Sequence, residues 1–205
     1  MSSSSAPITF TEVRFAWPDG STVLDALTRT FSTGRTGLVG RNGSGKSTLL
    51  RLISGELVPD AGSLEIRGPV GYLRQTASYD GDSTVSGLLG IKQVIDAIRA
   101  IESGDTSPNL FDIVGDDWDI EARAAEVLAR IGYPDVGLDR RVDELSGGES
   151  MLIAIGGLRV RRNPISLLDE PTNNLDREAR GRVAELVDDW PGTLVGRGQS
   201  RSGSA

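Results

Sequence analysis

The chain has 205 residues, a mass of 21.8 kDa, a formal net charge of −7 and a calculated isoelectric point near 4.7. This length suits one large domain or two small ones, and the acidic balance argues against nucleic-acid binding driven by overall charge. Because the chain has no cysteine and no histidine, disulfides, thiol nucleophiles, imidazole bases and histidine-ligated metals are excluded. Its chemistry must use carboxylates, hydroxyls, lysine, arginine and backbone amides.

Composition and hydropathy also bear on location. No run approaches the ~18 apolar residues that a membrane span needs. Residues 1–7 are a Ser-rich tail without the basic and apolar regions of a signal peptide. We therefore expect a cytoplasmic protein with no direct membrane insertion and a disordered tail at 1–7.

The first third of the chain reads as strands around one glycine-rich loop. Short segments that are apolar, or that alternate apolar and polar residues, predict strands at 8–15, 22–31, 37–39, 63–67 and 70–73. The segment 22–31 is expected to hold one or two strands. The strand at 37–39 leads into the glycine-rich loop. A helix is predicted at 47–54, where leucine and isoleucine recur at helical spacing until Gly55.

The middle of the chain changes to helical periodicity. Thr84 can cap a helix that Gly104 ends, and Asp119 can cap another that Gly132 ends. We expect residues 77–142 to form a helical subdomain inserted between two α/β parts. A strand at 165–168 and a helix running from the Asp176 cap through Trp190 follow.

An eight-residue segment fits the phosphate-loop pattern G-x-x-x-x-G-K-[ST] in full: Gly40, Arg41, Asn42, Gly43, Ser44, Gly45, Lys46 and Ser47. Glycines allow a nest of inward-pointing amides, and the helix that follows directs its positive end at phosphate. Lys46 would reach the β- and γ-phosphates, and the Ser47 hydroxyl would ligate Mg²⁺. Thr48 joins the predicted nucleotide-binding set. A glycine turn capped by serine is the alternative, which the strand and helix on either side disfavour.

The strand at 165–168 runs directly into two carboxylates. Asp169 is placed to hold Mg²⁺ through water, and Glu170 to orient and polarise the attacking water. Alone, this pattern is more often a solvated turn. Together with a phosphate loop it predicts a catalytic edge, because open α/β sheets bind ligands at the carboxyl ends of their strands.

A further motif, Leu145-Ser146-Gly147-Gly148-Glu149, is by itself an ordinary helix N-cap. The chain, however, contains four motifs in a particular order: the phosphate loop, Gln75 after a strand, LSGGE and LLDEPTNNLD. Together they resemble the nucleotide-binding domain of the ATP-binding cassette (ABC) superfamily. The resemblance covers about 8–194. It implies an α/β, P-loop NTPase core of ABC type with an N-terminal antiparallel β part and an inserted helical subdomain, forming one domain at 8–195.

The resemblance also implies roles for individual residues. Trp17 would stack on adenine, with Phe15 or simple core packing as alternatives. Gln75 would contact both Mg²⁺ and the attacking water. The implied catalytic residues are therefore Gln75, Lys46 and Glu170. The implied metal ligands are Gln75, Ser47 and Asp169. The signature residues Ser146, Gly147 and Gly148 would bind the γ-phosphate of ATP held by an opposite domain. One cassette then needs a second, in a homodimer or as a missing second half.

The phrases GRNGSGKSTLL, GYLRQ and EPTNNLD are most similar to the first cassette of an ABC-F protein. Members of that branch carry two cassettes on one chain and act on ribosomes or in antibiotic resistance. One alternative is the ATPase subunit of a membrane ABC transporter with a separate permease. Another is a non-hydrolysing ATP-binding fragment.

The resemblance stops at Val195, where the family continues with Val-Val-Val-Ser-His-Asp-Arg. Synonymous codons can be chosen for residues 196–202 that encode this family continuation when the reading frame is shifted by one base. We therefore interpret 196–205 as a truncated or out-of-frame ending, or else as a linker. Without the family's histidine we expect ATP binding with impaired hydrolysis, since losing one polar contact to the transition state costs about 10²–10³ in rate.

Overall fold

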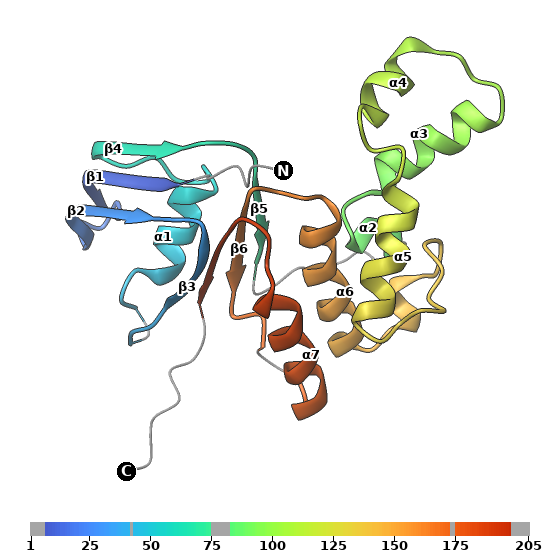
Figure 1. Cartoon of the computed structure of the whole chain (residues 1–205). Coiled ribbons are helices and arrows are strands. Elements are labelled where there is room, and N and C mark those ends of the chain that lie inside the picture. Colours follow the sequence, from blue (N-terminus) through green and yellow to red (C-terminus); the bar gives the residue numbers. More distant parts are fainter. Residues whose placement is uncertain (1–6, 42, 75–82, 173–174, 198–205) are drawn as a thin grey trace. The chain divides into compact units, whose positions relative to one another are not determined.

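The computed structural model describes residues 7–41, 43–74, 83–172 and 175–197 (Figure 1). The chain forms two compact units, the first from 1–76, 163–173 and 190–205 and the second from 77–162 and 174–189. The second unit extends beyond the predicted helical subdomain, because two later helices pack onto it.

The first unit contains an antiparallel sheet of order β2-β1-β4. Its strands are β1 (Ile8–Ala16), β2 (Thr22–Phe31) and β4 (Ala61–Ile66). The segment expected to hold one or two strands is a single ten-residue strand. A tight turn joins β1 to β2, closed by hydrogen bonds between the backbones of Trp17 and Ser21 and of Gly20 and Trp17.

The same unit contains a parallel sheet of order β3-β7-β6-β5. Its strands are β3 (Gly34–Leu38), β5 (Val70–Leu73), β6 (Ile165–Asp169) and β7 (Thr193–Arg197). All pairings in this sheet are parallel, so the carboxyl ends of the strands meet at one edge. The strand order places β7 between β3, which precedes the phosphate loop, and β6, which ends at Asp169.

Helix α1 (Lys46–Ile53) packs against both sheets. Its Leu49, Leu50 and Ile53 belong to one buried cluster with residues of the two sheets: Ile8, Phe10, Val13, Phe31, Ile165, Leu167 and Val195. Apolar burial on this scale contributes about 1.5–3 kcal/mol for each large side chain. The N-terminus of α1 is thereby held at the carboxyl edge of the parallel sheet.

The second unit is helical. It contains α2 (Val85–Leu88), α3 (Lys92–Glu102), α4 (Pro108–Val114), α5 (Ile120–Arg130), α6 (Gly147–Val160) and α7 (Arg177–Asp188), with a 3₁₀ turn at Val142–Glu144. Contacts link α5 to α6 and α6 to α7. Among the residues that the structure describes, no helix combines the length and apolar character needed to cross a membrane.

Two expectations for this unit need correction. The helix expected between Thr84 and Gly104 is divided into α2 and α3 at Gly90, whose φ of +70° is incompatible with a continuous α-helix. Thr84 and Asp119 stand at the starts of α2 and α5, but neither makes a side-chain capping bond. The Asp119 carboxylate instead lies 3.5 Å from Arg123 and 3.4 Å from Arg162.

Candidate functional site

The predicted phosphate loop connects β3 to α1. Gly40, Gly43 and Gly45 all have positive φ, at 156°, 82° and 82°. A Cβ atom on Gly45 would also lie 2.6 Å from Cγ1 of Val23, so only glycine fits there. Gly45 is the N-cap of α1 and provides no side-chain acceptor, which leaves the positive end of the helix to an anion.

The Lys46 side chain folds across this loop. Its ammonium donates to the carbonyl oxygens of Gly40 (2.7 Å) and Arg41 (2.6 Å) and to Oγ of Ser44 (3.2 Å), and the residue is only 9% exposed. The loop therefore holds the lysine charge beside the start of α1. Asn42, the remaining predicted residue of the loop, lies outside the described residues.

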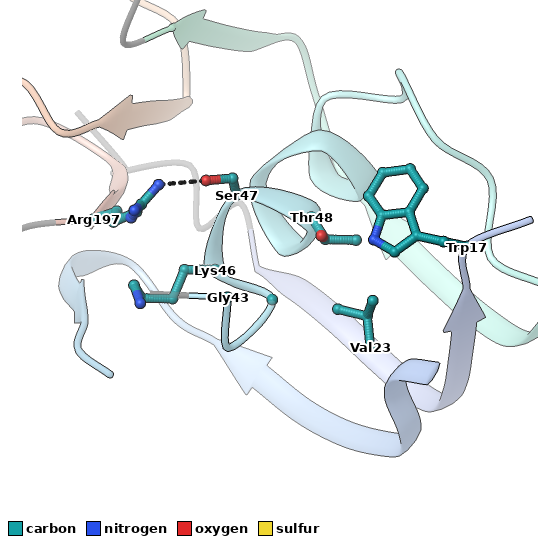
Figure 2. A pocket seen from close by; sticks show the side chains of 8 residues that line it. Trp17, Val23, Gly43, Lys46, Ser47, Thr48 and Arg197 are labelled. Atoms are coloured by element: carbon teal, nitrogen blue, oxygen red, sulfur yellow. Dashed lines mark hydrogen bonds between the residues drawn. The ribbon is translucent and has the colours of Figure 1, made fainter. Parts of the chain in front are cut away.

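A cavity of about 160 Å³ opens beside the loop (Figure 2). It is lined by Trp17, Val23, Gly43, Gly45, Lys46, Ser47, Thr48 and Arg197. Most small-molecule pockets exceed ~300 Å³, so a nucleotide bound here would extend beyond the cavity.

The two aromatic candidates for base stacking differ in position. Trp17 is half-buried and lines the cavity, whereas Phe15 is 7% exposed and packs edge-on against Trp17 with ring centroids 5.1 Å apart. The Arg51 guanidinium lies over the Trp17 ring, 5.7 Å from its centroid.

The carboxyl edge of the sheet brings the two predicted acids to the loop. Asp169 ends the fully buried strand β6 and is 7% exposed. Glu170 follows with a φ of +52°, a rare conformation for a residue with a side chain. Strain of this kind costs about 1–3 kcal/mol and persists where surrounding contacts impose it. One such contact joins the Glu170 amide to the carbonyl of Arg197 at 3.0 Å.

Arg197 is a site residue that the sequence analysis missed. Its Nη1 donates to Oγ of Ser47 at 2.5 Å and to Oδ1 of Asp169 at 3.2 Å, and its Nη2 lies 2.7 Å from Oε1 of Glu170. Gly196 and Arg197 were expected to belong to a separate tail, but they are the last two residues of β7. Continuing the predicted strand by two residues would have brought Arg197 to this edge.

The oxygen atoms expected to bind Mg²⁺ meet at Arg197. Ser47 Oγ and Asp169 Oδ1 both accept from the same guanidinium nitrogen, so the fold brings the two donors to one point. Hydroxyl and carboxylate oxygens suit Mg²⁺. The guanidinium, however, already engages both donors, so the arrangement seen here does not accommodate the ion. Gln75, the third predicted ligand, lies outside the described residues.

Tyr72 lies beside Asp169 from the neighbouring strand β5. Its hydroxyl donates to Oδ2 of Asp169 at 3.5 Å. Burial, reinforced by the charge of Asp169, raises the pKa of Tyr72 to about 12. The phenol is therefore neutral at physiological pH and keeps its proton toward the carboxylate.

The predicted signature residues belong to the second unit, where they begin α6. Ser146 and Glu149 form a reciprocal capping box: Ser146 Oγ accepts from the Glu149 amide at 3.2 Å, and Glu149 Oε2 accepts from the Ser146 amide at 2.8 Å. These bonds lower the pKa of Glu149. Gly147 is exposed and Gly148 half-buried. A capping role thus accounts for Ser146 within the chain, and its γ-phosphate role stays a prediction.

Asp176 caps α7 as expected, accepting from the Ala179 amide at 2.7 Å. Leu175 is buried at 4% exposure. Asn174, which precedes them in the motif, lies outside the described residues.

Comparison with known proteins decides the family. The model of the ABC transporter family matches residues 24–173, which include the phosphate loop, the signature and both carboxylates. The chain belongs to the ABC transporter family. It is an ATP-binding cassette of that family, as its motifs predicted.

Several curated relatives align with most of the chain. It is 34% identical over 201 residues to the tylosin resistance ATP-binding protein TlrC of Streptomyces fradiae, covering 86% of this chain and 37% of TlrC. It is 31% identical over 207 residues to the energy-dependent translational throttle protein EttA of Mycobacterium tuberculosis, covering 91% and 37%. The biotin transport ATP-binding protein BioM of Rhizobium etli is 34% identical over 172 residues, covering 84% and 74%. The chain thus spans little more than a third of TlrC and EttA.

Solved structures agree on the fold. A crystal structure of the ADP conformation of an ATP-binding cassette of an ABC transporter superposes with a TM-score of 0.70 at 20% identity, covering 95% of this chain and 81% of that chain. The expected α/β P-loop fold with an antiparallel N-terminal sheet is thereby confirmed.

Proposed function

We propose that the cavity beside α1 is where this cassette binds ATP. The observation that carries the proposal is the convergence at one cavity of the glycine loop, the buried Lys46, the aromatic Trp17 and the edge that holds Asp169. Lys46 would exchange its loop carbonyl partners for β- and γ-phosphate oxygens. Trp17, which lines the cavity while Phe15 packs in the core, would stack on the adenine.

The family resemblance assigns Mg²⁺ to Ser47, Asp169 and Gln75. In this structure Ser47 and Asp169 both accept a hydrogen bond from Arg197, so the charge opposite a bound phosphate would come from the side chains of the site. Glu170 would orient the attacking water. In this structure its carboxylate pairs with Arg197. We therefore propose that hydrolysis is slow while this ion pair holds, and a non-hydrolysing ATP-binding cassette is the alternative.

The signature residues support pairing with a second ABC cassette. Gly147 is exposed at the start of α6, and a Cβ atom there would meet nothing within 4 Å. Ser146, Gly147 and Gly148 would contact the γ-phosphate of ATP bound to a second cassette, either another copy of this chain or the other half of a longer protein.

For the whole protein we propose an ABC-F role in translation or antibiotic resistance. TlrC and EttA are named for tylosin resistance and for translational throttling, and each is much longer than this chain. BioM, which the chain covers to 74%, is named for biotin transport and supports the alternative of a transporter ATPase with a separate permease.

Two experiments test ATP binding by the cassette and the role of the whole protein separately. Displacement of a fluorescent ATP analogue by ATP tests the cassette, and absence of analogue binding would contradict it. Co-sedimentation with ribosomes at two salt concentrations, with and without ATP, tests the ABC-F role. We expect ATP-dependent pelleting that weakens at the higher salt. Copurification with a membrane permease and no pelleting would instead favour the transporter role.

A further inference from the structure

We propose that the guanidinium of Arg197 takes the place of the divalent cation at this site, so that the chain binds nucleotide with little dependence on Mg²⁺. The proposal deepens the nucleotide-binding function and rests on it. It assigns a specificity-determining role to a residue outside every predicted motif.

The sheet topology fixes Arg197 at this position. Strand β7 lies between β3 and β6, and its last residue is in register with Leu38 on one side and Asp169 on the other. Side chains alternate along a strand. Since Val195 and Leu167 share one buried cluster against α1, Arg197 and Asp169, each two residues later, return to the same face. That face is where α1 presents Ser47.

The guanidinium of Arg197 contacts both acidic residues of the site as well as Ser47. Its bond to Ser47 is drawn in Figure 2. The same guanidinium nitrogen bonds to Asp169, and the other nitrogen pairs with Glu170. The side chains of Arg197, Asp169 and Glu170 are 14%, 8% and 11% exposed. Buried charges are stable only when paired, so the two carboxylates and the guanidinium hold one another in place.

This arrangement competes with Mg²⁺ for the same oxygen atoms. Mg²⁺ binds oxygen at about 2.0–2.1 Å in near-octahedral geometry. While Nη1 bonds to Ser47 Oγ and Asp169 Oδ1, it takes the positions that the ion would need at Ser47 and its bound water would need at Asp169. Displacing the guanidinium would leave a buried arginine without its carboxylate partners. Lys46 adds a second cation to the cavity wall. The two positive charges of Arg197 and Lys46 balance the two negative charges of Asp169 and Glu170, so a polyphosphate would meet no net negative charge from these four side chains without a divalent cation.

The test compares nucleotide affinity in Mg²⁺ and in EDTA for four proteins. Arg197→Met keeps most of the side-chain length and removes the charge, Arg197→Lys keeps a charge, and Arg29→Ala alters an exposed arginine of β2 as the matched control. With a fluorescent ATP analogue, we expect Mg²⁺ to change the affinity of the wild type and of Arg29→Ala by less than about threefold. We expect Mg²⁺ to strengthen binding to Arg197→Met by at least about tenfold, with Arg197→Lys closer to the wild type.

Each outcome separates this inference from the proposed function. Equal Mg²⁺ dependence in the wild type and Arg197→Met would overturn the role of Arg197 while leaving nucleotide binding intact. Failure of every protein to bind the analogue would overturn the proposed function. In that event the role of Arg197 is judged from Mn²⁺ binding to the nucleotide-free proteins, followed by electron paramagnetic resonance. More Mn²⁺ bound to Arg197→Met than to the wild type supports the inference, and equal binding overturns it.

A folding control accompanies these measurements. Arg197→Met removes the positive charge that pairs with two buried carboxylates, so the variant is also made together with Glu170→Gln, which removes one of the two negative charges. The paired variant keeps Ser47 and Asp169, the two donors on which the competition with Mg²⁺ depends. It is therefore expected to show the same gain in Mg²⁺ dependence.

Discussion

Gly157 in the middle of α6 is a position where a single methyl group should destabilise the second unit. A Cβ atom there would lie 2.5 Å from the carbonyl oxygen, 2.6 Å from Cα and 2.8 Å from the carbonyl carbon of Leu89. All three are backbone atoms at the end of α2, which cannot move aside as the tip of a side chain can. Gly157→Ala must therefore push α6 and the end of α2 apart.

The size of the effect follows from two opposing contributions. Alanine in place of glycine inside a helix gains about 1 kcal/mol from propensity, and overpacking costs about 1–3 kcal/mol. Because contact with backbone favours the upper end of that range, we expect a net loss of about 1–2 kcal/mol. For a chain of this size this lowers the Tm by roughly 2–8 °C. Gly181→Ala in α7 is the matched control, since a Cβ atom there would meet nothing within 4 Å, and it should gain stability.

Thermal and urea unfolding followed by circular dichroism measure both variants beside the wild type. Equal stability of Gly157→Ala and Gly181→Ala would refute this prediction. A loss confined to Gly157→Ala would confirm that glycine is needed for the close approach of α6 to Leu89.

Three further predictions concern the sites. Trp17→Ala should weaken ATP binding by about 1–3 kcal/mol and leave tripolyphosphate binding unchanged. The control Trp118→Ala alters an exposed tryptophan of the second unit and should change the binding of neither ligand. Equal losses of ATP and tripolyphosphate binding in Trp17→Ala would argue against stacking. Ser146→Ala removes the capping box and should cost about 1 kcal/mol in urea unfolding, so an unchanged midpoint would count against that role. Because Tyr72 has a pKa of about 12 in the folded chain and about 10 when unfolded, unfolding releases its proton and stability falls as the pH rises from about 10 to about 12. Tyr72→Phe should therefore show a shallower alkaline loss of stability, and an identical profile would contradict this assignment.

The sequence predicted best where one local pattern determines the structure. Alternation in 8–15 and the apolar run at 165–168 each became a strand. The glycine loop, with Lys46 opening the helix after it, formed as expected because its conformation depends on glycines within the motif itself. These elements contain most of the candidate site.

Features that depend on contacts between distant segments were missed. The break between α2 and α3 lies at Gly90, which has a φ of +70°. The preceding Leu89 lies against Gly157, 68 positions further along the chain, an approach that no periodicity records. Arg197 was assigned to a tail because nothing local to it indicates a site. Its position comes from pairing with β3 and β6, and only that parallel register brings it to Ser47 and Asp169.

The central claim is that the loop around Lys46 binds the phosphates of ATP, and one comparison tests it most directly. The chain has two lysines, Lys46 in the loop and Lys92, an exposed residue of α3 paired with Asp96. Isothermal titration of ATP into the wild type, Lys46→Ala and Lys92→Ala should show affinity lost by about 10–100-fold in Lys46→Ala alone, since a hydrogen bond to a charged group contributes about 1.5–3 kcal/mol. Equal ATP affinity in Lys46→Ala and the wild type would contradict the account.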